Sequence, residues 1–181
     1  GLGNTTPDSE NNRHNVGFKI IDSINKNFGL SKQKPKFKGL LTTGDIEGEK
    51  VYAIKPLTFM NNSGICIREL LEYFKFDAED VIVFHDDLDV EFGKIKAKFG
   101  GSSAGHNGIS SIDKFIGKDY SRVRIGIGKP KTQIKVEDYV LQNFDEEELV
   151  GIDKISKNIT DSIGDLIKKK LDLFSSTVNN K

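Results

Sequence analysis

The stretch that decides the fold is Val81-Ile82-Val83-Phe84-His85-Asp86-Asp87-Leu88-Asp89. Its first four residues are apolar, and each is β-branched or aromatic, which is typical of a short strand buried on both faces. The chain then changes at once to a histidine and three carboxylates. Because open α/β sheets place their chemistry at the carboxyl ends of strands, this pattern predicts a functional site here. The alternative is a polar loop in which the aspartates cap turns.

Strands and helices alternate along most of the chain around this strand. Alternating or continuous apolar residues predict further strands over 36–46, 49–55, 93–99 and 122–128. Apolar spacings of three and four predict helices near 16–28, 63–74, 109–116, 136–143 and 145–171. We therefore expect one α/β domain over residues 1–181, with a twisted, mostly parallel mixed sheet and helices on both faces. We also expect residues 1–4 to end a strand that begins before residue 1, and a polar, loose tail from about residue 175.

The composition fits an ordinary globular protein, with 30% charged and 36% hydrophobic residues. No apolar run approaches the length of about 18 residues that a membrane span needs, and the first residues lack the pattern of a signal peptide. Cys66 is the single cysteine, which excludes an intrachain disulfide and fits a reducing compartment. We expect a cytoplasmic protein in which Cys66 is a small core residue.

The net charge is zero, but the charges are segregated along the chain. Residues 69–91 contain nine acids and one base, whereas residues 94–135 contain ten bases and two acids. A basic block of this kind can bind a polyanion while the whole molecule stays neutral. The alternatives are a solvated charged surface and, for the lysine row at 94, 96 and 98, protection of an exposed strand edge.

The chain has three histidines, and each lies next to an amide or a carboxylate. They are His14 beside Asn15, His85 beside Asp86, and His106 beside Asn107. A histidine oriented by a carboxylate can take a proton from water near neutral pH, and asparagines can hold an ester and a water molecule. These residues predict a hydrolase that activates water with His and Asp, without a covalent intermediate.

Three alternatives fit some of the same residues. The loop 101–105 matches the Gly-x-Ser-x-Gly pattern of a serine nucleophile, but His106 follows it at once with no acid between them. Asp86, Asp87 and Asp89 could bind a divalent metal, as in a phosphohydrolase. The lysine strand could also belong to a non-catalytic RNA-binding module.

The motifs, taken in order, resemble those of the bacterial-type peptidyl-tRNA hydrolases, monomeric esterases that free tRNA from stalled peptides. The matching motifs are Gly1-Leu2-Gly3-Asn4, Arg13-His14-Asn15-Val16-Gly17, Thr58-Phe59-Met60-Asn61-Asn62-Ser63-Gly64, His85-Asp86-Asp87-Leu88-Asp89, Gly105-His106-Asn107-Gly108 and Arg122-Val123-Arg124-Ile125-Gly126-Ile127-Gly128. They span most of the chain and are highly specific together. The resemblance implies a cytoplasmic, monomeric ester hydrolase that needs no metal or cofactor.

The resemblance also implies roles for the matching residues. His14 would be the general base for the attacking water, Asp86 would orient and support it, and Asn107 would position the water. The residues that would hold the peptide and the ester are Asn4, Met60, Asn61 and His106. By the same resemblance, Asp87, Asp89 and His85 would be structural.

The implied partner is peptidyl-tRNA, bound through its acceptor stem, 3′ end and 5′-phosphate. Lys96, Lys98 and Arg124 match basic positions tied to that phosphate, and the segment 129–143 matches a mobile stretch that gates the cleft. Two departures stand near the first asparagine. Thr5-Thr6 replace the usual Pro-Gly, and Ser9 replaces a tyrosine, so the contribution of that tyrosine to the cleft wall is not expected here.

Overall fold

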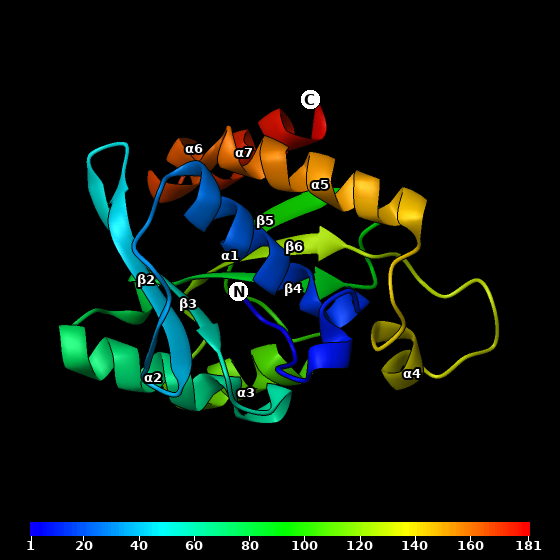
Figure 1. Ribbon diagram of the computed structural model, residues 1–181, viewed down its shortest axis with the longest axis horizontal. Coiled ribbons are helices and arrows are strands. Elements are labelled where there is room, and N and C mark those ends of the chain that lie inside the picture. Colours follow the sequence, from blue (N-terminus) through cyan, green and yellow to red (C-terminus); the bar gives the residue numbers. More distant parts are fainter.

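The strands of this protein form two three-stranded sheets, seen in a computed structural model that describes all residues from 1 to 181 (Figure 1). The first sheet has the order β1–β2–β3, with bounds Lys34–Lys36, Gly39–Ile46 and Glu49–Pro56. The second has the order β4–β6–β5, with β4 at Ile82–Asp87, β6 at Ser121–Gly126 and β5 at Ile95–Phe99. The predicted α/β class is confirmed.

Strand β4 is buried on both faces, as its sequence predicts. Successive side chains of a strand point to opposite faces, so Val83 and Phe84 enter different cores. Phe84 packs with α1 (Val16–Asn27), α5 (Glu146–Thr160), α6 (Ile163–Ile167) and α7 (Leu171–Asn179). Val83 packs with α2 (Ser63–Phe74) and α3 (Asn107–Ile116). Helices therefore cover both faces, as predicted (Figure 1).

The strand pairing is less parallel than the sequence analysis expected. The one parallel pair is β4 with β6, whereas β1–β2, β2–β3 and β5–β6 are antiparallel. Two tight turns make the strands of the first sheet antiparallel. The first turn contains Phe37 and Lys38 and the second contains Glu47 and Gly48, and all four residues have positive φ. Such turns match the twist of antiparallel hairpins. The first turn also divides the strand predicted over 36–46.

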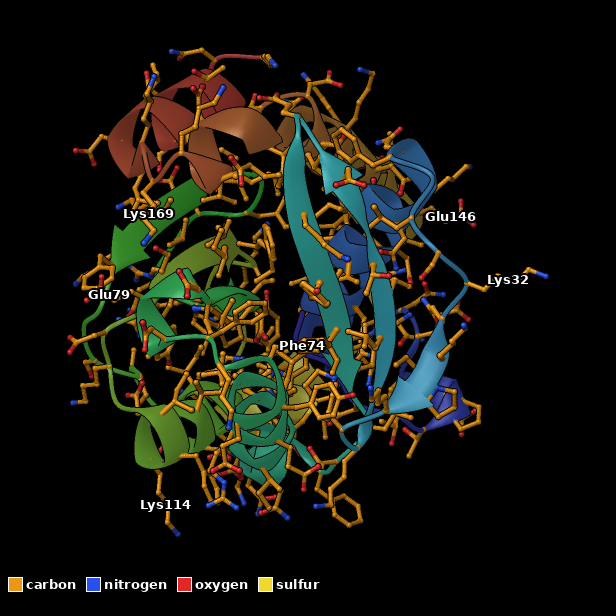
Figure 2. All side chains as sticks on the ribbon, turned by 90° about the vertical axis from the view of Figure 1, so that its left-hand side faces the viewer. Lys32, Phe74, Glu79, Lys114, Glu146 and Lys169 are labelled. Atoms are coloured by element: carbon orange, nitrogen blue, oxygen red, sulfur yellow. The ribbon has the colours of Figure 1, made fainter.

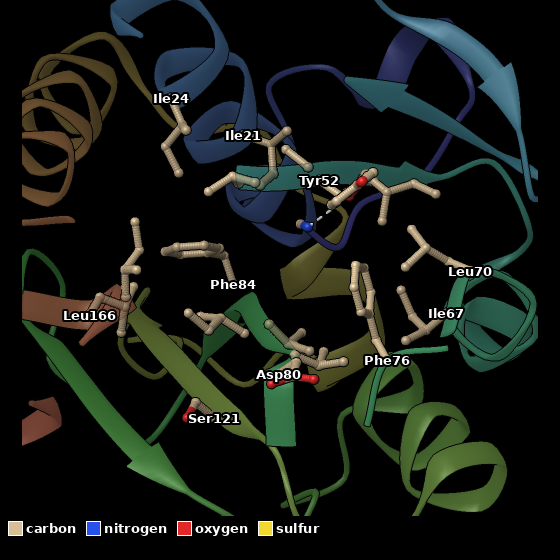
Figure 3. Close-up of a pocket in the computed structure, with 18 of the residues that line it drawn as sticks. Ile21, Ile24, Tyr52, Ile67, Leu70, Phe76, Asp80, Phe84, Ser121 and Leu166 are labelled. Atoms are coloured by element: carbon tan, nitrogen blue, oxygen red, sulfur yellow. Dashed lines mark hydrogen bonds between the residues drawn. The ribbon is translucent and has the colours of Figure 1, made fainter. Parts of the chain in front are cut away.

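Residues 1–3 lie between the two sheets. The backbone N–H of Leu2 donates to Phe84 O at 3.0 Å, and the backbone nitrogen of Gly1 donates to Ile54 O at 3.1 Å. An apolar cavity of about 440 Å³ adjoins them, with Ile24, Phe84 and Leu166 among its walls (Figure 3). A strand before residue 1 lies outside the described residues and stays a prediction.

The C-terminal part differs from the single long helix and loose tail that we expected. Helix α5 ends at Thr160, and a turn allows α6 to place Leu166 in the core. Helix α7 extends to Asn179 and buries Phe174 and Val178. Two polar residues of this tail have partners in β5, each at 2.8 Å. Ser175 Oγ accepts a hydrogen bond from Ala97 N. The Asn179 side-chain amide accepts from Ile95 N and donates to Ile95 O.

The remaining predictions for the core hold. Cys66 is fully buried, and burial raises the pKa of its thiol to about 12.

Charged side chains such as Lys32 and Lys114 point away from the fold (Figure 2). None of the helices has the length and apolar character that spanning a bilayer requires.

Candidate active site

The centre of the site is Asp86, at the carboxyl end of β4. Asp86 is 3% exposed and lies on the same face of the strand as Phe84, the face that α1 covers. His14 lies in the 3-10 turn Arg13–Asn15 that leads into α1, and it is also buried. Its Nδ1 lies 2.8 Å from Asp86 Oδ1. The fold therefore joins two predicted residues that are 72 positions apart in the chain.

His106 contacts the same carboxylate oxygen. Its Nε2 lies 2.9 Å from Asp86 Oδ1, while its Nδ1 accepts hydrogen bonds from Gly108 N and Ile109 N at the start of α3. Because Nδ1 is an acceptor, the proton of a neutral His106 is on Nε2 and is donated to Asp86. His106 thus caps α3 and helps to hold Asp86 in place. The sequence predicted a role for His106 in holding the substrate, but it did not predict this contact with Asp86.

The charges of this cluster follow from its hydrogen bonds. Burial raises the pKa of Asp86, but His14 and His106 outweigh it, so the pKa lies well below that of an ordinary aspartate. Burial lowers the pKa of His14, but the charge and hydrogen bond of Asp86 outweigh this effect, so the pKa of His14 lies above that of an ordinary histidine. An ionised Asp86 is only an acceptor, so His14 donates through Nδ1. No protein group hydrogen-bonds to Nε2 of His14, which leaves that nitrogen available to a substrate water.

His85 does not share this chemistry. Its Nδ1 donates to the backbone oxygen of Asp86 at 2.8 Å, and its ring packs edge-on against His106. Burial, with the nearby His106, lowers the pKa of His85 to about 3, so the ring is neutral at physiological pH. This placement fits the structural role that we expected for His85.

The predicted asparagines lie around the cluster at the ends of different elements. Asn4 is held by Asn15, whose side chain accepts from Asn4 N at 2.7 Å and donates to Asn4 O at 2.8 Å. Asn107 is exposed and begins α3, directly after His106. Asn61 is exposed in the 3-10 turn that contacts α3, where the buried neighbour Met60 packs close to Gly108.

A polar cleft of about 510 Å³ opens beside Asn4. Its walls come from the loop after Asn4, from Thr58 and Phe59, and from the segment after α4 (Val136–Val140). Ser9, the residue that replaces the family's tyrosine, is buried in this wall and shares a hydrogen bond with the Thr6 hydroxyl. The lining residues are Asn4, Thr5, Thr6, Asp8, Ser9, Asn12, Thr58, Phe59, Leu141 and Asn143.

The predicted phosphate-binding residues share one face of the second sheet. Lys96 lies directly opposite Arg124 in the β5–β6 ladder, and the side chains of Lys96 and Lys98 are exposed. Arg124 is half-buried and donates from Nε to Asp87 Oδ2 at 2.7 Å. Burial raises the pKa of Asp87, but the hydrogen bond from Arg124 outweighs it and the pKa is lowered.

The three aspartates proposed for a metal site have different partners. Asp86 bonds the two histidines, Asp87 pairs with Arg124, and Asp89 pairs with Lys129 at 3.0 Å. The metal-ligating atoms that do come together belong to His14, Asp86 and His106, within 4.8 Å of one another. The two histidines donate to the Asp86 carboxylate, so these atoms are already used in hydrogen bonds to one another. This favours a hydrogen-bonded cluster over the metal site of a phosphohydrolase.

Two residues that organise the site were not predicted from the sequence. Asn15 clamps the backbone of Asn4, and Arg13 joins the turn of His14 to the start of α5 through Glu148. Both belong to the motif Arg13-His14-Asn15, which is visible in the sequence. Their contacts are not visible there, because the partner of Asn15 is 11 residues away and that of Arg13 is 135 residues away.

Comparisons with known proteins agree on one family. A family model described as peptidyl-tRNA hydrolase matches residues 1–181. A peptidyl-tRNA hydrolase of Pelagibacter ubique (strain HTCC1062) is 80% identical over 100% of this chain and 97% of the relative. One of Bacillus subtilis (strain 168) is 44% identical over 97% of this chain and 94% of the relative. The crystal structure of peptidyl-tRNA hydrolase from Acinetobacter baumannii superposes with a TM-score of 0.91 at 32% identity, covering 99% of this chain and 92% of that one.

Proposed function

Because the chain belongs to the peptidyl-tRNA hydrolase family, we propose that it hydrolyses the ester joining a peptide to the 3′ end of a tRNA, with His14 activating the water. The observation that carries this mechanism is the hydrogen bond from His14 Nδ1 to Asp86 Oδ1, which directs the free Nε2 away from the carboxylate. An ionised, buried Asp86 holds the tautomer and stabilises the imidazolium that forms when Nε2 takes a proton.

The reaction is a water attack on the ester carbonyl. The water oxygen forms a bond to the carbonyl carbon while its proton passes to His14 Nε2. Collapse of the tetrahedral intermediate breaks the bond to the ribose oxygen, which receives the proton from His14 Nε2. The products are a peptide acid and a free tRNA, and His14 is neutral again. The exposed amides of Asn61 and Asn107 are suitable donors to the developing oxyanion and to the water.

Two features support a route without a covalent intermediate. The side chain of Ser102 accepts from the backbone N–H of Ala104, which orients it within its own loop. The Ser103 side chain has no hydrogen bond to a histidine, whereas a serine nucleophile needs such a base. His14, which does have an acidic partner, therefore acts directly on water in this proposal.

The basic face of β5 and β6 would bind the tRNA 5′-phosphate. Lys96 and Lys98 are free of acidic partners and exposed, so their ammonium groups are available to an anion. Arg124 would contribute its terminal nitrogens, because only Nε is engaged by Asp87. Such contacts make binding salt-dependent and largely independent of tRNA sequence.

The experiment compares the wild-type protein with His14→Ala and Ser103→Ala, using release of tRNA from an N-blocked aminoacyl-tRNA. His14→Ala should abolish turnover and keep tRNA binding, whereas Ser103→Ala should retain both. Turnover by His14→Ala would overturn the general-base role, and an inactive Ser103→Ala would restore the serine mechanism. Binding of charged tRNA by the wild-type protein with no release would instead favour the RNA-binding module.

A further inference from the structure

Arg13 is a buried cation next to the proposed base. It is 8% exposed, although arginine is rarely buried in proteins unless its charge is paired. Its Nη1 donates to Asn143 O at 2.6 Å and to Gln142 O at 3.3 Å, and its own backbone N–H donates to Gln142 O at 3.0 Å. Its Nη2 meets both oxygens of Glu148, at 2.7 and 2.8 Å. One side chain therefore connects the turn of His14 with residues 142–148.

Two aromatic rings contact the same guanidinium. Its Cζ lies 4.7 Å from the ring centre of Tyr139 and 5.3 Å from that of Phe144. The Tyr139 hydroxyl in turn donates to the backbone oxygen of Ile127 at 2.9 Å, directly after the end of β6. Cation–π contacts gain strength when the cation is desolvated, as Arg13 is. The guanidinium is thus the common contact of α4, of residues 142–144 and of the first turn of α5.

The segment that Arg13 holds forms a wall of the polar cleft. Leu141 and Asn143 line the cleft together with Asn4 and Phe59. Asn12, next to Arg13, forms an antiparallel bridge with Asn143, so the wall continues directly from the turn that carries His14. The distance between this wall and His14 therefore depends on the contacts of Arg13.

We propose that Arg13 is a positioning residue that holds the cleft wall 141–143 in register with His14, so that the bound substrate meets the base. This rests on the proposed hydrolysis of peptidyl-tRNA. Arg13 itself is covered by protein and acts only through the wall. Its loss should weaken the productive binding of substrate far more than it slows the chemical step.

The geometry requires arginine in particular. Two backbone oxygens and two carboxylate oxygens are met by the two terminal nitrogens of one planar fork. A lysine at this position keeps the charge but offers a single ammonium, which cannot meet both sets of acceptors. Arg13→Lys is therefore a sharper test than removal of the charge, and Glu148→Gln tests the same contact from the other side.

The first measurement is amide hydrogen exchange of residues 139–144, which needs no substrate. Arg13→Lys and Glu148→Gln should each speed exchange in this segment, while exchange in β4 and β6 stays as in the wild type. The matched control is Arg68→Lys, at an exposed arginine on α2 whose pair with Glu72 is solvent-exposed. Unchanged exchange in both test variants would overturn the proposed link to the wall.

The second measurement is steady-state release of tRNA from an N-blocked aminoacyl-tRNA across pH. Either variant should raise KM by about tenfold, the scale of one charge-assisted hydrogen bond, with kcat and the pH midpoint near wild type. A fall in kcat with KM unchanged, or a shifted midpoint, would mean that Arg13 acts on His14 and not on the wall. A wild-type protein that releases no tRNA would refute the proposed function, whereas the exchange result would still decide the role of Arg13.

Discussion

Gly17→Ala tests how the fold sets the distance between His14 and Asp86. Gly17 lies in the first turn of α1, where the helix crosses residues 1–3 and β4. A Cβ at this position would lie 2.4 Å from Phe84 O, 2.5 Å from Leu2 N and 2.6 Å from Leu2 O. All three atoms belong to the backbone, so none can move aside by a change of rotamer.

The size of the effect follows from these distances. Ordinary contacts begin at 3.4 Å, so the start of α1 must move by about 1 Å to accept the methyl group. Replacing glycine by alanine inside a helix usually gains about 1 kcal/mol. Overpacking costs about 1–3 kcal/mol, and rigid backbone neighbours favour the upper end, so we expect a net loss of about 2 kcal/mol. The same shift would stretch the 2.8 Å contact between His14 and Asp86 beyond hydrogen-bonding distance.

The assay combines urea unfolding with steady-state release of tRNA. A displacement of about 1 Å at a catalytic group costs roughly 10²-fold in rate, so turnover should fall by about that factor while the protein stays folded. Gly151→Ala is the matched control, since it lies in α5 and its Cβ would meet only the ring of Phe92, at 3.1 and 3.3 Å. That variant should be as active as the wild type. Wild-type stability and turnover in Gly17→Ala would refute the argument.

Three further predictions follow from the site and the core. Asp86→Asn removes the charge that raises the pKa of His14, so the midpoint of the acid limb of kcat/KM against pH should move to lower pH, with a lower plateau. A midpoint that stays or rises contradicts the assignment. Lys96→Ala and Lys98→Ala should each reduce the slope of log affinity for tRNA against log salt by about 1, measured by fluorescence anisotropy, and unchanged slopes would place the phosphate elsewhere. Phe174→Ala should lower the free energy of unfolding by about 3–5 kcal/mol, because the ring is fully buried, and a loss under about 1 kcal/mol would contradict its place in the core.

The sequence predicts the elements of this fold well because their signals are local. The apolar run at 81–84 and the spacing in α1 each report burial of a single segment, and both are confirmed. Strand pairing and the packing of the last helix depend on distant partners. Asn179 reads as a tail residue because its partner, Ile95, is 84 positions away.

The site shows the same division between local and distant information. His14 and Asp86 were predicted as a pair by resemblance, and the fold joins them. The contact of His106 with Asp86 and the anchoring of residues 142–143 by Arg13 were not predicted. Each contact depends on the exact residue at which a helix or strand begins or ends. A shift of one residue there turns a side chain to another face. The sequence pattern places these boundaries only to within one or two residues.

The hydrogen bonds from α7 to β5 bear on whether β5 can pair with a strand of another molecule. β5 is an edge strand, and an edge strand with free N–H and C=O groups can pair with a strand of another molecule. The Ser175 side chain occupies the outward N–H of Ala97, and the Asn179 side chain occupies both outward groups of Ile95. A side chain cannot extend the ladder further. The exposed lysines on either side of Ala97 add charge repulsion between copies. The last helix therefore covers part of the edge at which a strand of another molecule would have to pair, in addition to its share of the core.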